Sequence, residues 1–216
     1  MIQPQAMSKE AATSGILLNQ YPVMEHFYTI QGEGSHTGKA AYFIRLAGCD
    51  VGCVWCDVKE SWDAEKHSVQ TIDELVEVCK NHDAKNVVIT GGEPTLYPLQ
   101  NLTNALHQQN MQVWLETSGA HPITGNFDWI CLSPKKFKAP LAENLYLADE
   151  LKVVIFHPSD FEWAEQYAQL VKPETKLFLQ PEYSRFEKMV PVIVDYVKAH
   201  PKWQFSLQMH KIINVP

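Results

Sequence analysis

The chain lacks any stretch with the roughly 18 consecutive apolar residues of a membrane-spanning helix. It also lacks the basic start and the apolar run that are typical of a secretory signal. No dense tract of lysine and arginine is present, and 18 basic residues against 25 acidic ones leave a net charge of −7. This balance argues against a broad nucleic-acid-binding face. We therefore expect a cytoplasmic protein that binds neither membranes nor nucleic acids.

Internal repeats and low-complexity linkers are also absent, so the composition marks no boundary between domains. With 216 residues and 45% hydrophobic side chains, the length suits one domain with a sizeable core. The beginning of the chain resembles a loose extension. We predict a flexible N-terminal extension over residues 1–22 and a single domain over residues 23–216.

Cysteine is scarce, and its placement is uneven. Five cysteines is an odd number, and Cys49, Cys53 and Cys56 crowd into eight positions. In a reducing compartment such a group indicates metal binding rather than disulfides. Cys79 and Cys131 lie in apolar patterns, which predicts two small buried side chains.

Short apolar runs alternate with helical patterns along the chain. The runs are typical of strands that are buried on both faces. They cover residues 41–47, 86–90, 112–116, 129–132, 151–156, 176–180 and 204–208. Alternation of this kind implies parallel strands, and a full (β/α)₈ barrel needs about 250 residues. We therefore predict an α/β fold, an incomplete (β/α) barrel with a mostly parallel sheet.

Three serine or threonine residues stand three positions before a glutamate, a pattern typical of helix starts. These residues are Thr71, Ser159 and Ser184. Pro191 follows the third start and predicts either a kink or a late beginning of that helix.

Polar motifs follow several of the predicted strands. Cys49, Gly91, Ser133 and Gln180 all lie at or just after a strand's carboxyl end. In barrels of parallel strands the chemistry takes place at this end. The shared placement predicts one active site.

The spacing Cys49-x-x-x-Cys53-x-x-Cys56 suits an iron–sulfur cluster with an open position. Three thiolates hold three irons of a 4Fe–4S cubane and leave the fourth iron free for a small molecule. A zinc site would need a fourth ligand, for which His67 is the nearest candidate, and a redox dithiol is the other alternative. Trp55 either lies against a nucleobase or shields the cluster from water.

Two glycines and a glutamate follow the strand over residues 86–90. Gly91 and Gly92 let the backbone approach a ligand closely, and Glu93 offers an acceptor for an ammonium group. An ordinary turn at the end of a strand is the alternative.

The cysteine spacing together with residues 91–94 (GGEP) resembles radical S-adenosylmethionine enzymes. The resemblance implies that the open iron chelates the amino and carboxylate groups of S-adenosylmethionine. It further implies that one electron from the cluster releases a 5′-deoxyadenosyl radical, and that the glycine segment receives the methionine amino group.

Further motifs narrow the resemblance. They are residues 27–34 (FYTIQGEG), 43–45 (FIR), 133–135 (SPK), 208–211 (QMHK) and Asn214. Residues 24–216 are thereby similar to the 7-carboxy-7-deazaguanine synthase family. The resemblance implies radical ring contraction of 6-carboxy-5,6,7,8-tetrahydropterin to 7-carboxy-7-deazaguanine with loss of ammonia, in queuosine and deazapurine biosynthesis. It also implies a homodimer and a reductant such as flavodoxin.

The resemblance assigns site residues. The cluster ligands are Cys49, Cys53 and Cys56. The S-adenosylmethionine site comprises Gly91, Gly92, Glu93, Ser133, Pro134, Lys135, Gln180, Pro181, Glu182 and Tyr183. The pterin site comprises Ile30, Gln31, Gly32, Glu33, Arg45, Thr90, His210 and the C-terminal Pro216.

Several of these roles have a physical basis. The guanidinium of Arg45 suits the substrate carboxylate, because it forms two parallel hydrogen bonds. Gln31 and Glu33 offer the donor and acceptor types that a pterin edge needs, although residues 31–34 also suit a turn. Lys135 suits the methionine carboxylate. Glu116 suits either a ribose hydroxyl or a cap.

One position departs from the family pattern. Cys56 and Asp57 are followed by Val58, where the family commonly has a threonine whose hydroxyl ligates Mg²⁺. Valine offers no oxygen to a hard cation. We expect weak dependence on Mg²⁺.

Two other functions remain open at the level of the sequence. A glycyl-radical-type activating enzyme has the same cysteine spacing and acts on a protein partner. A non-catalytic metal-binding module would hold zinc.

Overall fold

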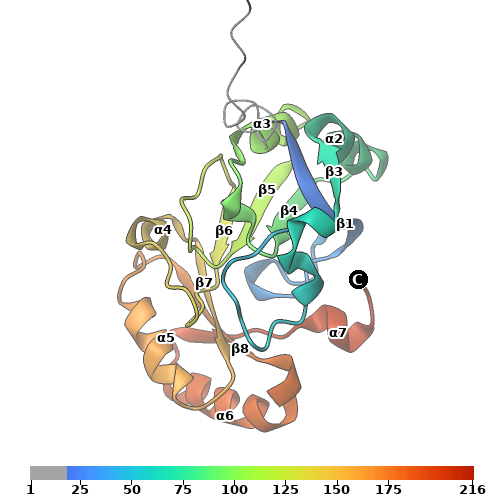
Figure 1. The fold of residues 1–216 in the computed structure, drawn as a ribbon. Helices are drawn as coiled ribbons and strands as arrows, with labels where there is room; N and C mark the ends of the chain where they lie inside the picture. The colour runs from blue at the N-terminus through green and yellow to red at the C-terminus, as the bar shows by residue number, and fades with distance from the viewer. Residues whose placement is uncertain (1–18) are drawn as a thin grey trace, which may run out of the picture.

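The computed structural model describes residues 19–216, which form one nine-stranded sheet with the order β3-β1-β2-β4-β5-β6-β7-β8-β9 (Figure 1). The strands are β1 (Gln20–Ile30), β2 (Ala40–Leu46), β3 (Ser68–Thr71), β4 (Asn86–Gly91), β5 (Gln112–Thr117), β6 (Trp129–Leu132), β7 (Glu150–Ile155), β8 (Lys176–Pro181) and β9 (Trp203–Phe205). From β2 through β9 every neighbouring pair is parallel, whereas β1 runs antiparallel to β2 and β3. Since β3 and β9 do not pair with each other, the barrel stays open, which confirms the predicted fold class.

Helices cover the outer face of this sheet (Figure 1). They are α2 (Ile72–Asn81), α3 (Gln100–Gln108), α4 (Ala142–Leu147), α5 (Asp160–Ala168) and α6 (Phe186–Ala199), with a short α7 (Met209–Ile213) near the C-terminus. One apolar cluster joins α2 and α3 to the first half of the sheet, and another joins α4, α5 and α6 to the second half. Within residues 19–216, none of these helices combines the length and the apolar character that crossing a membrane requires.

The opposite, inner face of the sheet carries the polar groups. Because side chains alternate along a strand, Val113 and Leu115 of β5 pack outward while Trp114 and Glu116 point inward. The inner positions at the carboxyl ends of the strands are therefore free to build a site.

The seven predicted strands are all present, but the sequence missed β1 and β3. Only Tyr21, Pro22 and Val23 of β1 are buried, so its pattern lacked the continuous apolar run of the inner strands. The predicted extension over residues 1–22 was drawn too long, since Gln20–Pro22 pair with β3. Residues 1–18 lie outside the described part. The last strand was placed too late, because β9 covers Trp203–Phe205 and the prediction covered residues 204–208.

The structure matches the three predicted helix starts to different degrees. Thr71 and Glu74 form the expected reciprocal capping box at the start of α2. No side-chain bond of Ser159 caps α5, although this helix begins at the next residue. Ser184 instead donates to Glu182, and α6 begins at Phe186. Pro191 lies inside α6, so it does not delay the start of that helix.

Candidate active site

Two cavities adjoin at the carboxyl ends of the parallel strands. The larger, of about 230 Å³, holds the three cysteines and is called the cluster cavity here. The smaller, of about 160 Å³, lies beside the C-terminal tail and is called the tail cavity. Seven residues line both cavities: Glu33, Arg45, Asp57, Val58, Thr90, Glu116 and Gln208. The two cavities therefore form one continuous site.

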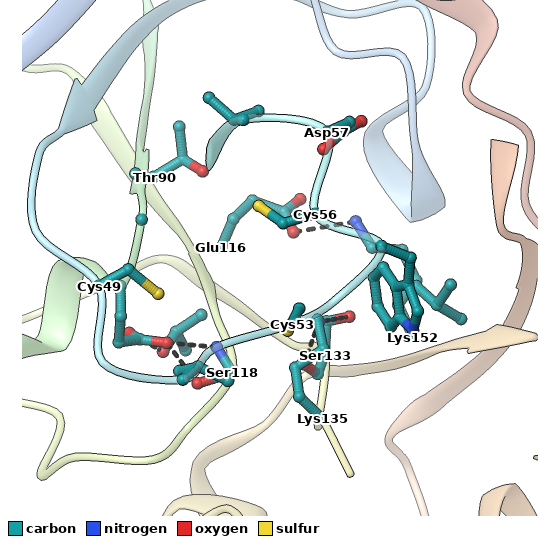
Figure 2. A pocket seen from close by; sticks show the side chains of 18 of the residues that line it. Cys49, Cys53, Cys56, Asp57, Thr90, Glu116, Ser118, Ser133, Lys135 and Lys152 are labelled. Carbon is teal, nitrogen blue, oxygen red and sulfur yellow. Dashed lines mark hydrogen bonds and ion pairs between the residues drawn. The ribbon is translucent and has the colours of Figure 1, made fainter. Parts of the chain in front are cut away.

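The cysteines lie on a single loop that curves around the cluster cavity (Figure 2). Their loop begins directly after β2, and a turn in which the Cys56 amide donates to the Cys53 carbonyl brings the last two close. Val51 and Ala120 pack against Cys53 and give the loop an apolar base.

The donor set fits a cubane rather than one metal ion. Among residues 19–216, no three histidine, cysteine, aspartate or glutamate side chains are grouped to hold a single ion. In a cubane each thiolate binds a different iron, so the cysteines need only surround a shared space. Burial raises the pKa of Cys49, and it raises that of Cys53 to about 11. Binding of iron must therefore displace thiol protons.

The glycine segment after β4 packs tightly against the start of the cysteine loop. The Gly92 amide donates to the Leu46 carbonyl at 3.0 Å, and the Glu93 amide donates to Gly48 at 2.9 Å. A Cβ atom at Gly92 would lie 2.4 Å from the Gly48 oxygen and 2.6 Å from the Cys49 Cβ. Glycine is needed at this position because the two loops touch there.

Glu93 lines the cluster cavity and is held in place by several hydrogen bonds. Its buried carboxylate accepts hydrogen bonds from Thr95, from Thr117 at 2.5 Å, and from both the amide and the hydroxyl of Ser118. These donors already occupy both carboxylate oxygens. Glu93 therefore joins the ends of β4 and β5.

The other residues assigned to S-adenosylmethionine mostly line the cluster cavity. They are Gly91, Ser133, Lys135, Gln180, Pro181, Glu182 and Tyr183. Pro134 is the exception, since it lines a neighbouring groove instead. The Glu182 carboxylate is already engaged, because it accepts from the Ser184 amide and hydroxyl of its own turn.

Lys135 is one of three cationic side chains that line the cluster cavity, together with Arg45 and Lys152. Its Nζ donates to the carbonyl and the hydroxyl of Ser133 at 2.5 and 2.6 Å. Burial lowers the pKa of Lys135 from its ordinary value. An anionic group arriving in this cavity would stabilise the charged lysine.

All eight residues assigned to the pterin line the tail cavity. They are Ile30, Gln31, Gly32, Glu33, Arg45, Thr90, His210 and Pro216. The fold thus brings residues 30–45 and Thr90 together with the C-terminal residues, which supports the grouping expected from the resemblance.

A buried ion network, missed in the sequence, connects the two cavities. Lys152 of β7 is 2% exposed, and its Nζ donates to Glu33 at 2.6 Å and to Glu116 at 2.9 Å (Figure 2 shows the pair with Glu116). Glu116 also accepts from Gln31 at 3.2 Å, so each of its carboxylate oxygens already has one donor. The sequence did contain a signal for this network. Lys152 is a lone lysine within the apolar run of residues 151–155, and a buried lysine is almost always paired with an acidic group.

The network shifts the pKa values of the two glutamates in opposite directions. Burial alone would raise the pKa of Glu33, but the charge and hydrogen bonds of Lys152 lower it to about 2. Burial raises the pKa of Glu116, and the nearby Glu33 and Glu150 add to this effect. Burial would lower the pKa of Lys152, yet the surrounding carboxylates hold it well above its usual value. Glu33 is thus a fixed anion, and Glu116 is the carboxyl closer to accepting a proton.

Arg45 lines both cavities and is already paired on one side. Its Nε donates to Glu25 of the neighbouring strand β1 at 2.7 Å. This contact fixes the plane of the guanidinium. The pair is partly exposed, and its contribution to stability is small.

The C-terminal tail closes the site over Gly32. The Met209 amide donates to the Gly32 carbonyl at 2.9 Å, and a Cβ atom at Gly32 would lie 2.2 Å from the His210 ring. Asn214 ends α7 in the left-handed conformation, and Pro216 reaches the tail cavity. The tail is therefore packed against the site, as the resemblance implied.

Known proteins are similar to this chain in sequence and in fold. A family model described as the Radical SAM superfamily matches residues 43–130. The 7-carboxy-7-deazaguanine synthase of Flavobacterium psychrophilum is 56% identical over 195 residues, which cover 90% of this chain and 92% of that protein. The chain belongs to the 7-carboxy-7-deazaguanine synthase family. The family member from Synechocystis is 48% identical over 202 residues, or 94% of this chain and 97% of that protein.

A solved structure extends the likeness to three dimensions. The crystal structure of QueE from Escherichia coli matches with a TM-score of 0.80 and 31% identity, covering 95% of this chain and 100% of that one. Membership in the 7-carboxy-7-deazaguanine synthase family, within the radical S-adenosylmethionine superfamily, implies a 4Fe–4S cluster and S-adenosylmethionine. This membership excludes the two alternative functions that the sequence left open, a glycyl-radical-type activating enzyme and a non-catalytic metal-binding module.

Proposed function

We propose that this protein is a radical S-adenosylmethionine lyase that contracts the ring of 6-carboxy-5,6,7,8-tetrahydropterin to 7-carboxy-7-deazaguanine with loss of ammonia. The observation that supports the proposal is the continuity of the two cavities. The three cysteines line one cavity and the eight residues assigned to the pterin line the other. Seven shared residues form the boundary, so cofactor and substrate would meet there.

Each group of residues has a physical task in this reaction. Cys49, Cys53 and Cys56 would hold the cluster, which when bound supplies the one-electron cleavage of S-adenosylmethionine. Lys135 would bind the methionine carboxylate. Glu33 and Gln31 would orient the pterin edge, with Lys152 holding Glu33 ionised. The tail would exclude water from the reacting centre.

The proposal extends to partners. The protein would use a low-potential reductant such as flavodoxin, act as a homodimer and work in the reducing cytoplasm. The five cysteines, all of which are free, suit such a compartment. The resemblance to the family supports the dimer.

Mass spectrometry of an anaerobic reaction tests the proposal. The reaction contains reconstituted, reduced protein, S-adenosylmethionine and 6-carboxytetrahydropterin. We expect 7-carboxy-7-deazaguanine and ammonia with the cofactor largely unconsumed. If 5′-deoxyadenosine forms without that product, the radical chemistry stands and the substrate assignment fails.

Replacing Arg45 with alanine should impair use of the pterin while S-adenosylmethionine cleavage persists without coupling. Loss of a charge-assisted contact to a carboxylate costs about 1.5–3 kcal/mol, or roughly a 10- to 100-fold increase in KM for the pterin. Product formation and 5′-deoxyadenosine are measured together. Glu25→Gln is the matched control, because it keeps the guanidinium and removes only the negative charge of its partner. An equal loss of both activities in Arg45→Ala would count against the carboxylate role.

Mg²⁺ should matter little for this protein. Val58 lines both cavities but has no oxygen ligand, and the adjacent Asp57 is paired with Lys211 at 2.5 Å. The residues therefore do not fit a Mg²⁺ site of the family type. We expect most of the activity to survive strict removal of Mg²⁺, and Val58→Thr to increase the response to added Mg²⁺. Val58→Ala is the control, since it changes the shape without adding oxygen. Activity that vanishes without Mg²⁺ and returns with it would refute this expectation.

A further inference from the structure

The side chain of Lys211 connects the C-terminal tail to the cluster cavity. Lys211 lies in α7, and its Nζ donates to the Asp57 carboxylate at 2.5 Å and lies 4.5 Å from the ring centre of Tyr183. Asp57 follows Cys56 on the cysteine loop (Figure 2), and Tyr183 lies in the turn after β8. Both residues line the cluster cavity. One residue of the tail therefore contacts two walls of that cavity.

The same segment of the tail holds the turn that carries Glu33. Gln208 donates to the Glu33 carboxylate at 3.0 Å, and the Met209 amide donates to the Gly32 carbonyl at 2.9 Å. These contacts and those of Lys211 come from four consecutive residues. The segment thus reaches from the residues assigned to the pterin to the loop that carries the cysteines.

Apolar packing contributes little to holding the tail in place. Within the part of the chain that the structure describes, α7 has no buried side chain, and its Ile212 and Ile213 are 54% and 48% exposed. Segments with few buried apolar contacts are the ones that open most easily. The docking of the tail therefore depends on its polar contacts, among which the ion pair of Lys211 is the one with the cysteine loop.

We propose that Lys211 is a positioning residue that latches the tail onto the cysteine loop and thereby couples closure of the tail cavity to the cluster cavity. This inference rests on the proposed function, which places the pterin in the tail cavity. Lys211 is not one of the described residues that line the two cavities, so it acts through the tail. A latched tail keeps the pterin in place while S-adenosylmethionine is cleaved. With the latch removed, the pterin leaves more readily and cofactor cleavage is no longer matched by product.

A lysine suits a latch that must also open. Its ammonium group can meet a carboxylate and the face of an aromatic ring at the same time. The side chains of Lys211 and Asp57 are 22% and 55% exposed, so both charges return to water when the pair separates. A partly exposed ion pair therefore holds the tail without the large penalty of breaking a buried one, and product release stays possible.

Replacing Lys211 with methionine tests the latch through the two products of the reaction. We expect KM for the pterin to rise about five- to tenfold, while kcat at saturating pterin and the iron content stay at the wild-type values. Below saturation, the ratio of 5′-deoxyadenosine to 7-carboxy-7-deazaguanine should rise. Lys211→Arg should restore the wild-type values, because arginine keeps the charge and both contacts. Lys198→Met is the matched control, since Lys198 forms an exposed pair with Asp195 within α6 at 3.3 Å, and it should change none of these quantities.

Hydrogen–deuterium exchange of the reconstituted holoenzyme measures the latch without turnover. The amides of residues 209–216 should exchange about five- to tenfold faster in Lys211→Met than in the wild type or in Lys211→Arg. Equal exchange in all three proteins would overturn the proposal. A lower kcat with an unchanged KM for the pterin in Lys211→Met would also overturn it. If wild-type protein forms no product from the pterin, the proposed function fails, and the exchange rates still decide whether Lys211 latches the tail.

Discussion

Replacing Lys152 with methionine should lower the free energy of unfolding by about 3–5 kcal/mol, because it leaves two half-buried carboxylates without their buried cation. Lys152 holds Glu33 at 2.6 Å and Glu116 at 2.9 Å, and its own side chain is 3% exposed. Chemical denaturation at pH 7 measures the loss. Lys172→Met is the matched control, since Lys172 forms a half-exposed pair with Asp149 at 3.9 Å, and we expect it to cost about 0–1 kcal/mol.

The destabilisation of Lys152→Met should depend on pH with a definite sign. In the wild type, the lowered pKa of Glu33 stabilises the fold above the unfolded-state pKa, and this contribution is lost as the pH falls toward about 2. Without Lys152, burial raises the folded-state pKa of Glu33 and Glu116, so the penalty grows as the pH rises above the unfolded-state value. The difference from wild type should therefore be smaller at pH 5 than at pH 8. A loss below about 1 kcal/mol at both pH values would show that the network is not important for stability.

Replacing Cys53 with alanine should abolish cluster binding and S-adenosylmethionine cleavage while leaving the protein folded. Cys53 lines the cluster cavity, and two remaining thiolates cannot hold three irons of a cubane. We expect the iron content after reconstitution to fall from about four per chain to near background. Iron content, the visible absorption and 5′-deoxyadenosine are measured on the same sample.

Cys79→Ala gives the opposite result and is the control for Cys53→Ala. Cys79 is a fully buried free cysteine of α2 that packs in the core between that helix and the sheet. Truncating a small buried side chain costs about 1 kcal/mol of stability without touching the cluster. Full iron content in Cys53→Ala, or lost iron in Cys79→Ala, would show that the cysteine loop is not the cluster site.

Some parts of the fold followed from local patterns alone. Thr71 and Glu74 stand three positions apart, so their capping box depends only on the helix they begin. The inner strands could be predicted because burial on both faces leaves a continuous apolar run. β1 escaped prediction because it is an antiparallel strand in which only Tyr21, Pro22 and Val23 are buried, so its identity depends on β2 and β3 beside it.

Glu93 and Lys152 show which contacts in the site local sequence patterns could not predict. The motif of residues 91–94 did not indicate that the carboxylate of Glu93 accepts hydrogen bonds from Thr117 and Ser118 at the end of the next strand. Lys152 was not recognised as a site residue, because it lies within an apolar strand and its partner Glu33 is 119 positions away in the sequence. A buried charge is determined by its partners, and the sheet register selects those partners.

By itself the sequence determined the cysteine loop, the alternation of strands and helices, and the chemical types present at each strand end. These features depend on neighbours within a few positions, where backbone geometry limits the choices. Only the tertiary structure decided which charges are paired and how the two cavities join. Those contacts join residues far apart in the chain, and packing of the whole sheet brings them together.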